Sequence, residues 1–247
     1  GFVHRAEPDV QVTGHQVERE YYINDVGNQI NTMGKSLYFR LRELKGDKVE
    51  FPEDGYQGDY MKDLAREYLT AQGTAPDALT DDTVLALGRY AADAILAGIR
   101  KDLEDFGVGF DTWFSEAELY NQGWLERSFK LLKDRGYLYE HEGALWFRAT
   151  EFGDEKGRVV RRSTGATTYF ASDIAYHLQK FERGYDLVVD IWGADHHGYV
   201  PRLQAAAQAL GCEGRLKTIL VQLVSLVRHG EPVAMTTRGG TFVTLRE

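Results

Sequence analysis

The stretch that decides the fold is Leu187-Val188-Val189-Asp190-Ile191-Trp192-Gly193-Ala194-Asp195-His196-His197-Gly198. It opens with an apolar run that only Asp190 interrupts, which is typical of a strand buried on both faces. Glycine and short polar residues follow, and the next segment, residues 199–210, has the pattern of a helix. The stretch therefore predicts a buried strand, a polar turn and a helix.

The same alternation of elements extends to both sides of this stretch. Before it we expect a strand at residues 158–162 and a helix at 174–182, and after it a second buried strand at 218–227. This order of strands and helices indicates an α/β fold with a parallel sheet. Such sheets bind ligands at the carboxyl ends of their strands, where Gly193 and Asp195 lie. We therefore expect a nucleotide-using enzyme.

The middle of the chain indicates mostly helices and no recognisable catalytic chemistry. Asn or Asp in the segment 24–29 can cap a helix that begins near Gln29. Apolar residues recur with a helical period over residues 81–106, and Glu142-Gly143 fits the turn of a hairpin. The expected elements are a strand at 16–23, helices at 29–44, 81–106 and 124–135, and a hairpin at 137–147.

Length and composition exclude several classes of protein. The 247 residues suffice for one large domain or a domain with an insertion, and 43% hydrophobic with 27% charged residues indicates a soluble globular chain. No apolar run of about 18 residues could span a membrane. A net charge of -9 argues against binding nucleic acid by bulk charge. The single cysteine, Cys212, fits a reducing cytoplasm.

Four stretches resemble signature sequences of one enzyme family. They are Tyr21-Tyr22-Ile23-Asn24-Asp25-Val26-Gly27-Asn28-Gln29, Gly55-Tyr56-Gln57-Gly58-Asp59-Tyr60, Phe110-Asp111-Thr112-Trp113-Phe114-Ser115-Glu116 and Trp192-Gly193-Ala194-Asp195-His196-His197-Gly198. In this order they are similar to bacterial arginyl-tRNA synthetases, over residues 14–247. The resemblance implies a class I synthetase with a Rossmann-like parallel sheet. Such an enzyme joins L-arginine to ATP, used with Mg²⁺, and transfers the arginyl group to tRNA(Arg).

The chain departs from this family at both ends. It has no His-Ile-Gly-His type motif, which binds the ATP phosphates in class I enzymes, and no helical anticodon-binding domain. We therefore expect a fragment of the catalytic core, with an incomplete first nucleotide-binding half. The expected division is an unassigned tag or linker at 1–13, a remnant of the first half at 14–34, a mainly helical insertion at 35–155 and the second half at 156–247.

Tyr169 and Asp173 are the candidates for binding arginine. They are four residues apart, so one helical turn can present both to one ligand. The resemblance places them in the arginine pocket, and a carboxylate suits the paired hydrogen bonds of a guanidinium. The alternative is that Ser172 or Asp173 merely caps a helix that begins at Ile174.

Gly193, Asp195 and His196 are the candidates for binding the nucleotide. They resemble the Gly-x-Asp turn of class I synthetases, in which glycine admits the ribose and the polar side chains bond its hydroxyls. The alternative is a metal site, because Asp195, His196 and His197 offer three ligands in a row. Adjacent residues seldom point at one ion, so we expect no protein-bound metal.

A third group of candidates lies in Met235-Thr236-Thr237-Arg238-Gly239-Gly240, which occupies the place of the family's Lys-Met-Ser-Lys-Ser loop. Both lysine positions are non-basic here, with Ala234 and Thr237, so Arg238 is the cation left to offset charge on the phosphates. We expect Arg238 and Thr237 to act in catalysis, and Met235 and Gly239 to bind the nucleotide. A plain surface hairpin is the alternative.

Three functions remain open from the sequence. The first is an arginine-tRNA ligase core that handles arginine, ATP and tRNA(Arg), without membrane contact, and is inactive as this fragment. The second is a non-catalytic synthetase-like protein with a retained binding surface, and the third is another nucleotidyl-transferring enzyme of the same fold. The basic run Lys156, Arg158, Arg161 and Arg162 fits contact with tRNA and a solvated edge strand equally well.

Overall fold

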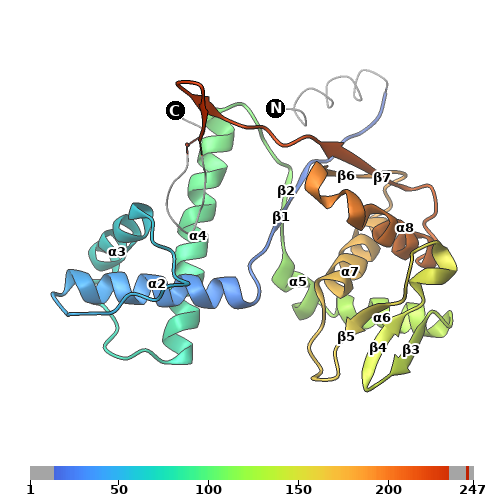
Figure 1. Cartoon of the computed structure of the whole chain (residues 1–247), viewed down its shortest axis with the longest axis horizontal. Helices are drawn as coiled ribbons and strands as arrows, with labels where there is room; N and C mark the ends of the chain where they lie inside the picture. Colours follow the sequence, from blue (N-terminus) through green and yellow to red (C-terminus); the bar gives the residue numbers. More distant parts are fainter. Residues whose placement is uncertain (1–13, 234–242, 245–247) are drawn as a thin grey trace. The chain divides into compact units, whose positions relative to one another are not determined.

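The computed structural model describes residues 14–233 and 243–244. The chain divides into two compact units, residues 1–114 with 225–247 and residues 115–224 (Figure 1). The sequence-based division into segments 14–34, 35–155 and 156–247 assigns them to the two halves of a nucleotide-binding fold and to an insertion. That division stays a prediction. No helix of the described residues is long and apolar enough to cross a membrane.

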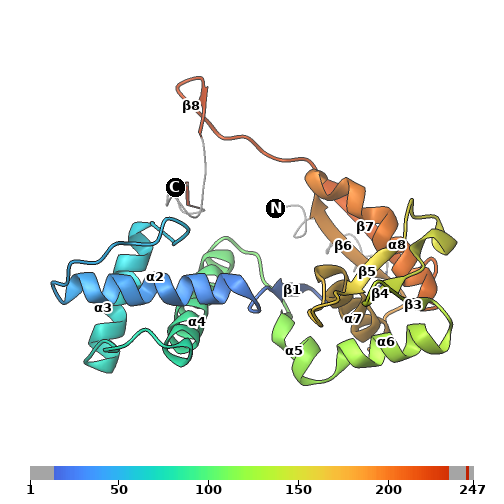
Figure 2. The same cartoon turned by 60° about the horizontal axis from the view of Figure 1, so that its bottom comes forward.

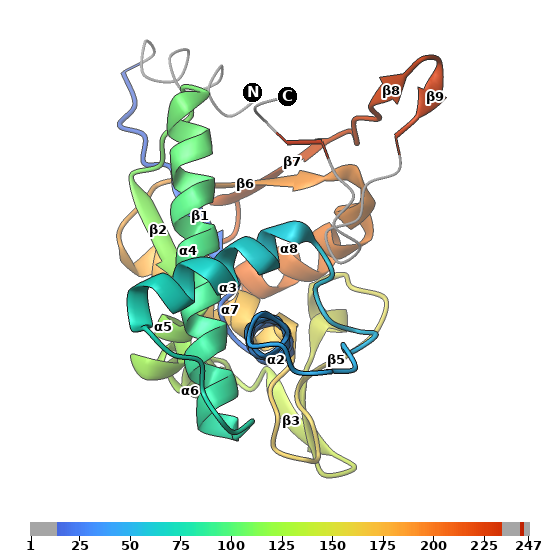
Figure 3. The ribbon, with the colours of Figure 1, turned by 90° about the vertical axis from the view of Figure 1, so that its left-hand side faces the viewer.

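Three helices build the first unit. They are α2 (Asn28–Leu44), α3 (Asp59–Gln72) and α4 (Asp81–Asp105), and α2 packs across α4 (Figure 3). Strands β1 (Glu20–Ile23) and β2 (Thr112–Ser115) pair, and β8 (Val227–Arg228) forms a short antiparallel ladder with β9 (Glu231–Pro232). The core is a set of buried apolar side chains from the three helices: Leu37, Leu41, Met61, Leu64 and Leu87.

Glycines allow α2 and α4 to approach closely. A Cβ at Gly88 would collide with the backbone carbonyl of Ile30, and a Cβ at Gly34 would collide with the carbonyl of Val84. Because backbone atoms cannot move aside as a side chain can, both positions must stay free of a side chain.

Two expected helices of this unit are confirmed, at 28–44 and 81–105, while α3 adds to the expected elements. The expected cap of the first helix is wrong. Gly27 is the N-cap of α2 with φ 89°, and no side chain caps it. Glycine reaches this backbone conformation without strain, so the chain enters α2 through a glycine turn and not through an Asn or Asp cap. Strand β1 is also shorter than expected, since it begins at Glu20.

The second unit combines helices with two small sheets (Figure 2). Its helices are α5 (Glu116–Asn121), α6 (Trp124–Asp134), α7 (Tyr169–Glu182) and α8 (Val200–Ala209). Its strands are β3 (Leu138–His141), β4 (Ala144–Phe147), β5 (Arg158–Arg161), β6 (Val188–Gly193) and β7 (Leu216–Val221). Two 3₁₀ turns complete it, η1 (Ala149–Phe152) and η2 (Ala194–Tyr199).

Strands β3 and β4 form the expected hairpin. Leu138 pairs with Phe147, and the turn residues Glu142 and Gly143 both have positive φ, at 51° and 72°. Strand β5 joins this hairpin antiparallel to β4. The expectation that residues 158–162 belong to the parallel sheet is therefore wrong. Strand β5 pairs instead with β4, the strand before it in the chain, from which η1 separates it.

Strands β6 and β7 form the parallel pair that the sequence predicts. They are in register from Val188 opposite Leu216 to Gly193 opposite Val221, and α8 connects them. Figures 1 and 3 show α7 and α8 on one side of this pair. The fold class, a mixed α/β fold with a parallel sheet, is confirmed.

The expected burial of these strands on both faces is wrong. Along β6, Val188 and Asp190 are buried while Val189 and Ile191 are exposed. Side chains alternate between the two faces of a strand, and within residues 115–224 the helices α7 and α8 cover one face. Strand β7 also ends at Val221, short of the expected residue 227.

Candidate functional site

Helix α7 begins earlier than the sequence predicts. Thr168 is its N-cap, and the side chain accepts a hydrogen bond from the amide of Ala171. The same hydroxyl donates to the carbonyl oxygen of Val159 at 2.9 Å, which fixes the start of α7 against β5. Asp173 therefore lies inside the helix, and the alternative in which Ser172 or Asp173 opens it is wrong. The physical reason is that Thr168 reaches both a helix amide and a strand carbonyl, which neither later residue does.

Tyr169 and Asp173 lie one turn apart on α7, as their spacing predicts. Tyr169 is 75% exposed, while the Asp173 side chain is partly buried. The hydroxyl of Tyr199 donates a hydrogen bond to Oδ2 of Asp173. Burial raises the pKa of the Asp173 carboxyl, and the hydrogen bond from Tyr199 opposes that shift only in part.

Asp173 forms no ion pair with a lysine, arginine or histidine in the described part of the chain. A carboxylate removed from water is costly unless a cation or several donors satisfy it. This side chain has one neutral donor, Tyr199, and a second oxygen that can accept from a ligand. The site is therefore suited to a cationic group.

Asp190, on strand β6, differs from Asp173 because its carboxylate has charged and polar partners within the protein. Its two oxygens contact His177 Nε2 at 2.8 Å and Lys180 Nζ at 2.9 Å, and all three side chains are buried. Burial works against ionisation of Asp190, but His177 and Lys180 together hold the pKa of this carboxyl well below its usual value. Asp190 is thus a paired charge inside the unit, and not a free ligand.

His177 connects this pair to the candidate site. Its Nδ1 lies 2.7 Å from the carbonyl oxygen of Asp173, and its Nε2 faces Asp190. The ring therefore lies between the main chain of α7 and the carboxylate of β6. The main chain at Asp173 is in this way tied to β6.

The predicted nucleotide turn lies at the carboxyl end of β6. Gly193 is the last residue of the strand, and any Cβ there would collide with the carboxylate of Asp195. The Asp195 and His196 side chains are 55% and 64% exposed, with His196 Nε2 at 3.6 Å from Asp195 Oδ2. The placement of these three residues is as predicted, and their contact with a nucleotide stays a prediction. The described residues hold no group of three side chains that could bind a metal ion.

Tyr199 brings the two groups of candidates together. It ends η2, directly after the nucleotide turn, and its ring centroid lies 5.8 Å from that of Trp192. Its hydroxyl reaches Asp173 on α7. Sequence reasoning missed Tyr199, and the available signal was its position at the end of the turn. The remaining candidates, Met235, Thr237, Arg238 and Gly239, lie outside the described residues.

Two arginines of the basic run are engaged in ion pairs. Arg158 pairs with the buried Asp154, and Arg161 Nη2 lies 2.7 Å from Glu126. This arrangement matches an edge strand with charged side chains.

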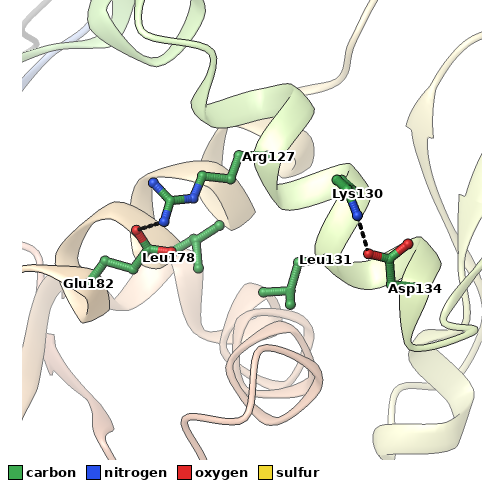
Figure 4. Close-up of a pocket in the computed structure, with 6 residues that line it drawn as sticks. All are labelled: Arg127, Lys130, Leu131, Asp134, Leu178 and Glu182. Carbon is green, nitrogen blue, oxygen red and sulfur yellow. Dashed lines mark hydrogen bonds and ion pairs between the residues drawn. The ribbon is translucent and has the colours of Figure 1, made fainter.

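A pocket of about 260 Å³ lies between α6 and α7 (Figure 4). Its charged residues pair with one another, Arg127 with Glu182 and Lys130 with Asp134. The pocket residues Leu178 and Glu182 follow Asp173 by five and nine positions, which places them on the far side of α7. The pocket is therefore separate from the candidate site.

A parallel strand–helix–strand unit with glycine and aspartate at its carboxyl end is the arrangement in which α/β proteins commonly bind nucleotides. Residues 9–247 match the model of the family described as "tRNA synthetases class I (R), catalytic domain", and the chain belongs to this family.

Curated relatives named arginine--tRNA ligase agree with this assignment. The protein of Citrifermentans bemidjiense is 55% identical over 96% of this chain, and that of Syntrophotalea carbinolica is 56% identical over 95%. The chain spans 43% of the length of each. A crystal structure from Campylobacter jejuni, named as an arginyl tRNA synthetase, has a TM-score of 0.83 and 40% identity, covering 90% of this chain and 49% of that one. The arginyl-tRNA synthetase of Plasmodium falciparum, at 11% identity and TM-score 0.58, shares the fold.

Proposed function

We propose that this chain is the central part of an arginine-tRNA ligase, and that it holds L-arginine and the ribose end of ATP. One observation carries the proposal. Asp173 is a partly buried carboxylate with a neutral hydrogen-bond donor and no ion pair among the described residues. It lies one turn from Tyr169 and is joined through Tyr199 to the end of β6. The relatives named arginine--tRNA ligase support the choice of arginine as the cation.

Each candidate residue has one role in this proposal. The Asp173 carboxylate binds the guanidinium of arginine, with Tyr169 beside it, because charge-assisted bonds to a carboxylate suit that planar cation. Gly193, Asp195 and His196 receive the ribose of ATP, with Met235 and Gly239 as further contacts. Arg238 offsets negative charge on the phosphates, which enter as the Mg²⁺ complex of ATP, and the hydroxyl of Thr237 donates a hydrogen bond to them. The carboxylate of arginine attacks the α-phosphate of ATP, so that arginyl-adenylate forms and pyrophosphate leaves. A hydroxyl of the terminal ribose of tRNA(Arg) then attacks the arginyl carbonyl in the cytoplasm, and AMP leaves.

The test is arginine-dependent exchange between ATP and pyrophosphate, measured with and without tRNA. We expect exchange by the full-length gene product with L-arginine, and at least about a hundredfold less with L-citrulline, which has the same shape without the charge. Residues 1–247 alone should exchange poorly, because positioning of the triphosphate contributes much of the rate and the chain has no His-Ile-Gly-His type motif.

Two outcomes would contradict parts of this account. Robust exchange by residues 1–247 would show that the phosphates need no further motif. No exchange by the full-length gene product, together with retained arginine binding, would favour a non-catalytic synthetase-like protein, to which Ala234 and Thr237 at the lysine positions also point.

A further inference from the structure

Tyr199 is held rigidly by residues from three elements. Its ring meets Phe170 of α7 edge to face, with centroids 6.3 Å apart, and Trp192 of β6 at 5.8 Å. The guanidinium carbon of Arg202, on α8, lies 4.6 Å from the centre of the same ring. A phenol ring fixed on three sides leaves its hydroxyl little freedom to move. The hydroxyl is therefore a preorganised donor.

This donor acts on one oxygen of Asp173. It binds Oδ2, which leaves Oδ1 as the acceptor for a ligand. Burial and the neighbouring Asp173 carboxylate raise the pKa of the Tyr199 hydroxyl, so it keeps its proton and remains a neutral donor. A lysine or arginine in its place would neutralise Asp173 and compete with a cationic substrate. A neutral donor orients the carboxylate and preserves its charge.

We propose that Tyr199 is a positioning residue for substrate binding: its hydroxyl fixes the Asp173 carboxylate so that Oδ1 faces the guanidinium, and it links that carboxylate to the β6–η2 turn. This inference rests on the proposed function, because it requires that Asp173 binds arginine. It makes Tyr199 a determinant of arginine affinity that does not itself touch the substrate. The role is distinct from packing, since the hydroxyl and not the ring performs it.

The hydroxyl should also set the pH range in which arginine binds. The charged groups that face Asp173 are His177 and Lys180 on α7, which favour its ionised form, and Asp190 on β6, which opposes it. Tyr199 of η2 adds a donor to the ionised form. Without that donor the pKa of Asp173 rises further. As the solution is acidified, a protein that lacks the Tyr199 hydroxyl should therefore lose arginine binding at a higher pH than the wild type does.

The test compares Tyr199→Phe with Tyr185→Phe in the full-length gene product. Tyr185 is a matched control because its hydroxyl binds Arg183 at the surface of the same unit. The measurements are the dissociation constant of L-arginine from about pH 5 to pH 8, the affinity for ATP alone and the thermal midpoint. For Tyr199→Phe we expect arginine binding about ten- to a hundredfold weaker, from loss of a hydrogen bond to a charged group. We also expect the pH midpoint of binding to move upward, with little change in ATP affinity, and Tyr185→Phe should match the wild type.

A second variant covers the case in which Tyr199→Phe folds poorly. Fluorotyrosine at position 199 keeps the ring and makes the hydroxyl a stronger donor, so the pH midpoint of arginine binding should move downward.

The inference is overturned if both changes at position 199 leave arginine affinity and its pH midpoint as in the wild type while Asp173→Asn abolishes binding. In that case Asp173 keeps its role and Tyr199 only packs. If Asp173→Asn also binds arginine normally, the arginine pocket of the proposed function is wrong as well.

Discussion

The two units bury polar side chains for different purposes. In the first unit, Ser36 donates to the carbonyl of Thr32 at 2.7 Å and accepts from the amide of Tyr56 at 2.9 Å, while Arg40 binds the carbonyl of Gln57. These bonds tie the loop before α3 onto α2 and serve the fold. In the second unit, Asp190 contacts both Lys180 and His177, whereas Asp173 forms no ion pair among the described residues. This difference supports the proposal that the Asp173 carboxylate binds a ligand.

The largest effect should come from breaking the charge cluster of the second unit. Asp190→Asn leaves the buried Lys180 without the countercharge that it contacts and weakens the contact with His177, which should lower the free energy of unfolding by about 3 to 5 kcal/mol. Chemical denaturation measures this loss. Asp186→Asn, at an exposed site just before β6, is the control and should change little.

The same variant has a defined pH dependence. The pKa of Asp190 is lowered in the folded state, so its contribution is complete above the unfolded pKa of about 4 and is lost as the pH falls through the lower folded value. The stability gap between wild type and Asp190→Asn should therefore stay constant above about pH 5 and narrow only in strong acid. A gap that closes between pH 5 and pH 7 would contradict this assignment.

The first unit should be most sensitive where α2 meets α4. Gly88→Ala places a methyl group against the backbone of Ile30 and should cost about 2 to 3 kcal/mol of stability. Gly98→Ala on the same helix is the matched control, since its Cβ would meet no atom within 4 Å, and it should stabilise by up to about 1 kcal/mol. Arginine binding should be unchanged in folded Gly98→Ala protein. Equal effects of the two substitutions would show that α2 and α4 are not in close contact.

A smaller effect is expected at the start of α7. Thr168→Ala removes the cap of the helix and should lower stability by about 1 kcal/mol, whereas Thr168→Ser keeps a hydroxyl and most of the stability. Chemical denaturation measures this loss, because the amide of Ala171 also donates to the backbone carbonyl of Thr168 at 3.0 Å and keeps that bond in Thr168→Ala. A Thr168→Ala protein as stable as the wild type would mean that the hydroxyl of Thr168 does not stabilise the start of α7.

The sequence was sufficient for elements whose signals are local. Alternating helices and strands predicted the parallel β6–β7 pair and its turn. Glu142-Gly143 predicted the hairpin because Gly143 adopts positive φ without strain.

It was insufficient where the outcome depends on residues distant in the chain. Thr168, Ser172 and Asp173 are all acceptable caps by type, and the bond from Thr168 to Val159 decides between them. The hydrogen bond from Tyr199 to Asp173 joins residues 26 positions apart, and no periodic pattern in the sequence predicts such a contact. The exposed face of β6 depends on which helices cover the sheet, which apolar composition alone does not reveal.

The central claim is that the Asp173 carboxylate, which forms no ion pair among the described residues, binds the guanidinium of arginine. Its test is to measure the L-arginine dissociation constant and the thermal midpoint together for wild type and Asp173→Asn. The folded pKa of Asp173 is raised, so its ionised form lowers stability above that pKa, and the penalty disappears as the pH falls below it. At neutral pH the account predicts that Asp173→Asn loses about 2 to 5 kcal/mol of arginine binding while its thermal midpoint is equal to or higher than that of the wild type. Unchanged arginine affinity, or a clear fall in the thermal midpoint, would contradict it.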